Sequence, residues 1–191
     1  IAMGKIAAGF AARFPEIRLE VTTEDRPVDM IEEGYDLVIR VNPAPDQSLV
    51  GRAFLRDRLV VVASPSVARP ADGMAAPAVV RGSLDQAEDW KVKTPDGELR
   101  IAVEPVLSVS SMVMNRDAVR AGAGVGRLPV SLVSHDLAGG TLVHWGDIDG
   151  PEIALWALYP SRRLLSARVS AFLDYLKSAF PTGEPDELAA F

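Results

Sequence analysis

Two strand–helix–strand patterns, separated by a hairpin, constrain most strongly how this chain can fold. The first spans residues 17–41, with a strand at 17–21, a short helix at 28–33 and a buried strand at 37–39; the second spans residues 106–128. In such a unit the helix crosses over the sheet, so the two strands are expected to be parallel. The pattern predicts an α/β fold of two lobes, each a mostly parallel sheet flanked by helices.

The rest of the chain supplies further elements of both kinds. Hydrophobic residues three and four apart predict amphipathic helices at 1–14 and 166–180, and a shorter helix is expected at 129–137. Pro95-Asp96-Gly97 is typical of a hairpin turn within 90–103. We expect other strands at 49–63, 141–145 and 152–159, irregular structure at 69–83 and a frayed tail at 181–191.

Composition excludes several classes of function. The 191 residues include no cysteine and only two histidines, so neither thiolate chemistry nor a histidine-rich metal site is expected. The formal net charge of -6 argues against direct DNA binding, which requires a basic face. No apolar run is long enough to cross a membrane and no export signal is recognisable, so a cytoplasmic protein without membrane contact is expected.

The ends of the predicted parallel strands indicate where a ligand binds. In open α/β sheets, ligands lie at the carboxyl ends of strands beside helix N-termini. This rule selects residues 22–26 with 40–42, and residues 110–112 with 124–127. Because free backbone N–H groups and the helix dipole stabilise negative charge, an anionic ligand is favoured, of which a small carboxylate is one kind.

Each candidate residue also has a purely structural interpretation. Arg40 could form a structural ion pair, Ser110 and Ser111 could simply cap a helix, and Glu24 with Asp25 could do the same. The glycines at 122, 124 and 126 follow a helix and open a strand, which is the reverse of a dinucleotide-binding loop. His135 and Asp136 have no nucleophile beside them and are interpreted as a surface pair on a helix.

Several stretches, in order, resemble the effector-binding domain of LysR-type transcription regulators. Residues 28–40 match that family's d-l-x-x-G-x-D-l-a-i-R pattern, and residues 121–129 resemble its a-G-x-G-i-a-x-l-P pattern. Further matches lie at 14–20, 48–65 and 159–163. The order and spacing agree over about residues 1–180, and the ordered set is far more specific than any one motif.

The resemblance implies a fold similar to periplasmic binding proteins. Lobe I would comprise residues 1–64 and 161–191, lobe II residues 65–160, with crossovers near Ser64-Pro65 and Pro160-Ser161. A winged helix-turn-helix domain outside this chain would bind the DNA. The fold rule and the resemblance together nominate these ligand-binding residues: Thr23, Glu24, Arg40, Val41, Asn42, Ser64, Ser110, Ser111, Met112, Gly124 and Arg127.

The function implied by the resemblance is effector sensing without catalysis. A small molecule would bind between the lobes, and a homodimer or homotetramer would relay the change to DNA-binding domains. We expect no cofactor, no metal and no enzymatic activity. The alternative is a stand-alone periplasmic solute-binding protein of the same fold.

The charge of the chain generates a first prediction. The isolated chain should not bind duplex DNA measurably at physiological salt, because a net charge of -6 with no basic stripe cannot neutralise phosphates. Gel-shift titration with the purified chain measures this. A sub-micromolar, salt-dependent shift would contradict it.

Overall fold

The chain forms two units that are each built from their own sheet. The computed structural model describes residues 3–22, 29–85 and 87–190. Unit 1 comprises Ile1–Asp57 with Ile153–Phe191, and unit 2 comprises Arg58–Glu152. Both boundaries precede the crossovers expected near Ser64-Pro65 and Pro160-Ser161. The reason is strand pairing. The strand that begins at residue 59 pairs only within unit 2, and the strand that begins at residue 153 pairs only within unit 1.

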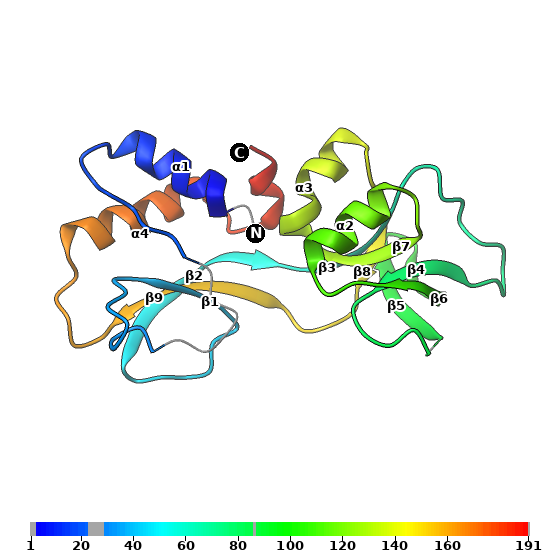
Figure 1. Ribbon diagram of the computed structural model, residues 1–191, viewed down its shortest axis with the longest axis horizontal. Coiled ribbons are helices and arrows are strands. Elements are labelled where there is room, and N and C mark those ends of the chain that lie inside the picture. Colours follow the sequence, from blue (N-terminus) through cyan, green and yellow to red (C-terminus); the bar gives the residue numbers. More distant parts are fainter. Residues whose placement is uncertain (1–2, 23–28, 86, 191) are drawn as a thin grey trace. The chain divides into compact units, whose positions relative to one another are not determined.

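Unit 1 is a three-stranded sheet covered on one face by two helices. Its strands are β1 (Val38–Val41), β9 (Ile153–Pro160) and β2 (Leu49–Asp57), in the order β1-β9-β2. Both pairings with β9 are antiparallel. Helices α1 (Met3–Arg13) and α4 (Ala167–Ala179) lie on the same face of this sheet (Figure 1).

Aromatic residues at helical spacing hold α1 and α4 together. The ring of Phe10 in α1 lies 5.0 Å from that of Phe172 and 5.6 Å from that of Tyr175, both in α4 and both edge-on. Ser166 caps α4, as expected, by accepting the N–H of Val169. The sequence therefore predicted both helices and their buried faces correctly.

Of the first predicted strand–helix–strand unit, only the final strand is present, as β1, and it pairs antiparallel with β9. Residues 17–21 form no strand, and the only regular structure between residues 29 and 37 is turn. The Asp29 carboxylate accepts the N–H groups of Ile31 and Glu32, and the chain then reverses at Gly34, where φ is 75°. Asp29 thus caps the start of this turn, and Gly34 ends it in the left-handed conformation. A segment of this length is too short to form a stable helix.

The C-terminal tail is packed rather than frayed. A 3₁₀ helix, η1 (Pro185–Ala190), buries Pro185 and leaves Leu188 0% exposed in the core of unit 1. The Gly183 carbonyl accepts the Arg56 N–H at 2.7 Å, which joins the tail to β2. The expectation of fraying rested on the two prolines and overlooked Leu188 as an anchor.

Unit 2 is a closed six-stranded barrel with mixed pairing. Its order is β3-β7-β4-β6-β5-β8. β4 is parallel to both of its neighbours, whereas the remaining pairs are antiparallel, so the α/β fold is confirmed but the sheets are mixed rather than mostly parallel. The strands are β3 (Leu59–Ala63), β4 (Ala76–Val80), β5 (Glu88–Thr94), β6 (Gly97–Ser108), β7 (Val125–Pro129) and β8 (Val143–Ile148).

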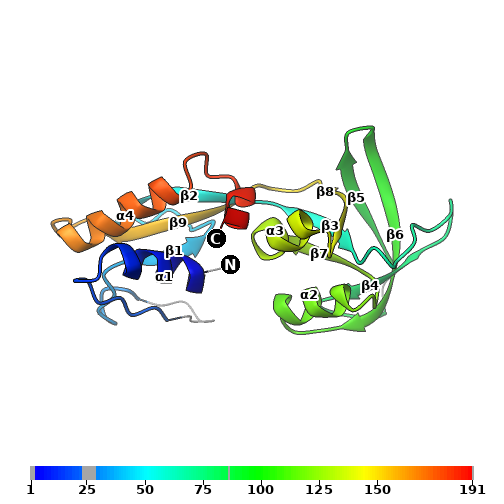
Figure 2. The same ribbon diagram turned by 90° about the horizontal axis from the view of Figure 1, so that it is seen from above.

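The second predicted strand–helix–strand unit is present in this barrel. It consists of β6, helix α2 (Met112–Arg120) and β7, with β4 lying between the two strands. The hairpin of β5 and β6 turns at Pro95 and Asp96, as expected, and extends away from α2 and α3 (Figure 2). β4 was missed because prolines, alanines and glycines around it favoured an irregular segment.

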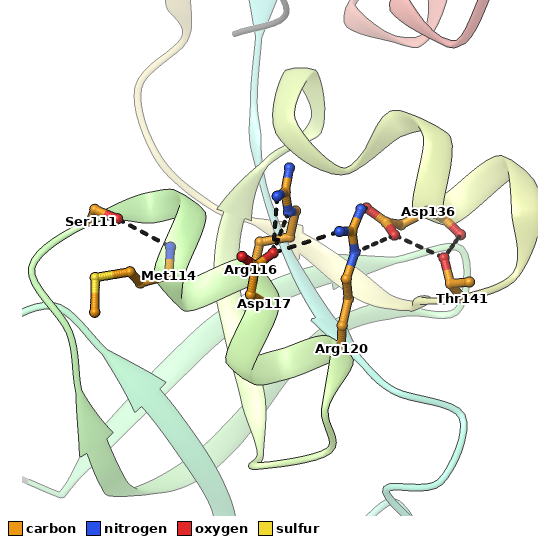
Figure 3. A network of polar contacts seen from close by, with 7 residues as sticks. All are labelled: Ser111, Met114, Arg116, Asp117, Arg120, Asp136 and Thr141. Carbon is orange, nitrogen blue, oxygen red and sulfur yellow. Dashed lines mark hydrogen bonds and ion pairs between the residues drawn. The ribbon is translucent and has the colours of Figure 1, made fainter.

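Helix α3 (Val130–Gly139) is joined to α2 by a partly buried ion pair (Figure 3). The Arg120 guanidinium donates to both carboxylate oxygens of Asp136 at 2.7 Å, and the Thr141 hydroxyl donates to Asp136 at 2.8 Å. Asp136 is only 4% exposed, so its interpretation as a surface residue is wrong.

Among the described residues, no helix is long and apolar enough to cross a membrane.

The packed tail generates a stability prediction. Leu188→Ala should lower the free energy of unfolding by about 2–5 kcal/mol, because it leaves a cavity in the core of unit 1. Leu164→Ala is the control, since Leu164 is 99% exposed and its loss should change stability by less than about 0.5 kcal/mol. Urea unfolding of both variants measures the difference. Equal stability of the two would mean that the tail is not anchored.

The Arg120–Asp136 ion pair generates a pH prediction. Burial alone raises the pKa of Asp136, but the hydrogen bonds from Arg120 and Thr141 and the charge of Arg120 outweigh it and hold this pKa below its usual value. A lowered folded-state pKa stabilises the fold above the unfolded pKa of about 3.9, and this contribution is lost as pH falls through the folded pKa.

Asp136→Asn should therefore lower the free energy of unfolding by about 1–3 kcal/mol near pH 7 and by less below about pH 4. Urea unfolding between about pH 7 and pH 3 measures this difference. Asp117→Asn is the matched control, because the Asp117 side chain is 56% exposed and its loss should cost less than about 1 kcal/mol. A destabilisation by Asp136→Asn that does not change with pH would rule out the charge as its cause.

Candidate functional site

Unit 2 contains a cavity of about 510 Å³ at the carboxyl ends of its parallel strands. This volume is within the usual range of pockets for small molecules, roughly 300–1,000 Å³. The ends of β4 and β6, the start of α2 and one residue of β7 meet there, as the fold rule predicts. The lining residues are Leu59, Val79, Val80, Arg81, Gly82, Ser83, Glu88, Trp90, Val109, Ser110, Met112, Asn115 and Arg127.

The N-terminus of α2 forms one wall of the cavity. Ser111 has an extended backbone and its hydroxyl accepts the N–H of Met114 at 3.1 Å, so it is the N-cap (Figure 3). Ser110 and Met112, on either side of this cap, line the cavity. The first turn of α2 therefore offers uncapped N–H groups and the positive end of the helix dipole to an anion.

Arg127 supplies positive charge beside an aromatic platform. Its guanidinium carbon lies 5.4 Å from the ring centroid of Trp90, which is 3% exposed. Neither Arg127 nor Arg81 forms an ion pair with any residue that the structure describes. Two unpaired guanidinium groups in one cavity indicate a site that accepts a negatively charged group.

Asn115 lies in the wall between α2 and the barrel. It is 2% exposed, and its side-chain amide donates to the Val79 carbonyl at 3.0 Å, while its Oδ1 has no partner within the described structure. A Cβ on Gly126 would lie 2.8 Å from this oxygen, so only glycine fits there. Buried acceptors without a donor are rare in folded proteins, and this one packs against the backbone of Gly126.

The structure brings together three of the predicted residues of unit 2: Ser110, Met112 and Arg127 all line the cavity. Ser111 takes the capping role that was its alternative. Ser64 shares a hydrogen bond of 2.9 Å with Ser66, and Gly124 permits a close approach to Pro77, because an added Cβ would lie 2.4 Å from that carbonyl oxygen.

The other predicted residues belong to unit 1. Arg40 and Val41 lie in β1, where Arg40 is opposite Trp156. Asn42 has a φ of 41° and exchanges two hydrogen bonds with the backbone of Ala154, so it fastens the end of β1 to β9. Thr23 and Glu24 lie outside the described residues.

Sequence reasoning missed the loop from Arg81 to Ser83 and the residues Glu88, Trp90 and Asn115. The loop directly follows the apolar run Ala78-Val79-Val80, which is a strand end with polar residues after it. The rule that selected residues 110–112 would have selected this loop as well, had β4 been recognised. Nothing local in the sequence indicates that Glu88, Trp90 and Asn115 meet there.

A family model and sequence relatives show which family the chain belongs to. A sequence model described as LysR substrate binding domain matches residues 2–181. LtrA of Klebsiella pneumoniae, named a probable HTH-type transcriptional regulator, is 27% identical over 90% of this chain and 59% of its own length. PtxR of Pseudomonas aeruginosa, an HTH-type transcriptional regulator, is 26% identical over 92% of this chain and 59% of its own length. The chain thus spans about three-fifths of these curated relatives.

Solved structures share the fold. The regulatory domain of AphB from Vibrio vulnificus matches with a TM-score of 0.72 at 24% identity, over 92% of each chain. The regulatory domain of CrgA, a LysR-type regulator of Neisseria meningitidis, matches with a TM-score of 0.71 at 24% identity, over 93% of this chain and 91% of that one. The family match covers nearly the whole sequence, and the chain belongs to the LysR substrate-binding domain family.

Proposed function

We propose that this chain is the effector-sensing part of a LysR-type transcription regulator that acts in the cytoplasm and has no catalytic activity. The names of its relatives support regulation over solute transport. A winged helix-turn-helix domain outside the chain would bind DNA, and a homodimer or homotetramer would relay the signal. Sensing requires only that the effector bind two global states with different affinity.

We propose further that the cavity of unit 2 binds a small effector that carries an anionic group, such as a carboxylate. The observation that carries this proposal is the combination of Arg127, without an ion-pair partner in the described structure, and the first turn of α2, in which the Ser111 cap uses only the N–H of Met114. The guanidinium would bind the anion through charge-assisted hydrogen bonds, and Ser110 with the first-turn N–H groups would complete its coordination.

The proposed site generates a binding prediction. Arg127→Ala should weaken the binding of an acid found by a thermal-shift screen of organic acids by about ten- to a hundredfold, because a charge-assisted hydrogen bond contributes about 1.5–3 kcal/mol. Isothermal titration calorimetry measures this loss, with Ser110→Ala as a second variant at the same wall. Arg100→Ala is the matched control, since Arg100 is exposed on β6 and does not line the cavity.

Two outcomes would contradict the proposal. One is a folded Arg127→Ala protein that retains full affinity, and the other is a screen in which only compounds without an anionic group bind. Arg40→Ala, in unit 1, is measured beside these variants and tests the role predicted for Arg40 separately.

A further inference from the structure

The cavity contains a carboxylate as well as guanidinium groups, and the two kinds of charge do not pair. Glu88 lines the cavity, and its Oε2 accepts the Trp90 indole N–H at 3.1 Å. Arg127 lies over the ring of the same Trp90. Within the described structure Glu88 makes no ion pair, so both side chains next to this indole retain their charge for a ligand.

A ligand that is only anionic does not suit this wall. It would be attracted by Arg127 but repelled by the nearby Glu88 carboxylate, and an unpaired like charge lowers affinity. A molecule with an anionic and a cationic group would satisfy both side chains at once. Glu88 therefore selects against simple acids.

The remaining lining fits such a molecule. Val79, Val109 and Met112 provide apolar surface, which suits a small hydrocarbon side chain. The wall thus offers partners for a carboxylate, for an N–H donor and for an apolar group.

We propose that the effector is an amphoteric molecule of the α-amino-acid type with an apolar side chain. Its carboxylate binds Arg127 and the first turn of α2, and its ammonium group binds Glu88. This inference rests on the proposed function, because it assigns the chemical class of the ligand to the same cavity.

The test compares matched triads of ligands by calorimetry on the 191-residue chain. One triad is L-leucine, 4-methylpentanoate, which lacks the ammonium group, and 3-methylbutylamine, which lacks the carboxylate. A second is L-phenylalanine, 3-phenylpropanoate and 2-phenylethylamine, and the other apolar L-amino acids are screened beside them. We expect at least one amino acid to bind about tenfold or more tightly than both of its partial analogues.

Glu88→Gln distinguishes recognition from a structural role, since the amide oxygen can still accept the Trp90 N–H. We expect this variant to bind the amino acid about tenfold more weakly and the deaminated acid equally or more tightly. Glu104→Gln, on the exposed face of β6, is the control for net charge and should change neither affinity.

Any outcome other than these expected ones overturns the inference. If the deaminated acids bind as tightly as the amino acids, and Arg127→Ala weakens them, the amphoteric class is wrong while the proposed function stands. If no amino acid binds at millimolar concentration but an acid from the wider screen does, the result is the same. If neither set binds, the proposed site fails together with the inference.

Discussion

The close approach of β7 to its neighbours is the constraint on which the functional unit depends. Gly124 lies against the carbonyl of Pro77, and Gly126 lies against Asn115 and Val119, at distances that leave no room for a Cβ. In the barrel β4 lies between β6 and β7, and α2 packs against β4 and β7. The end of β4, the start of α2 and Arg127 of β7 all line the cavity.

Helix α2 connects this cavity to the rest of unit 2. Its first turn forms the wall that carries the proposed anion site, and its last turn is fixed to α3 by the Arg120–Asp136 ion pair (Figure 3). Because an α-helix is stiff over this length and the ion pair is buried at Asp136, a ligand that displaces the start of α2 also acts on α3. A chain of packed contacts of this kind is one physical route by which a ligand is coupled to a distant surface.

The sequence predicted correctly those elements whose stabilising contacts form between residues close together in the chain. The caps of α2 and α4, the hairpin between β5 and β6 and the amphipathic α1 were all predicted, because each depends on residues a few positions apart. The same kind of signal gave a wrong prediction in unit 1. Residues 17–21 alternate as a strand would, but they form no strand in the part of the chain that the structure describes. Beyond residue 181, where the family match ends, Leu188 still completes the core.

The sequence by itself determined the fold class, the family, and the candidate residues Ser110, Met112 and Arg127, because strand ends and helix starts are encoded by short patterns. Only the tertiary structure decided which side chains share the cavity. Glu88 and Trp90 come from β5, Arg81 follows β4, and Asn115 belongs to α2, so strand order rather than sequence distance brings them together. Likewise, the burial of Asp136 arises from Arg120 sixteen residues away, since the pair forms only when α2 and α3 pack.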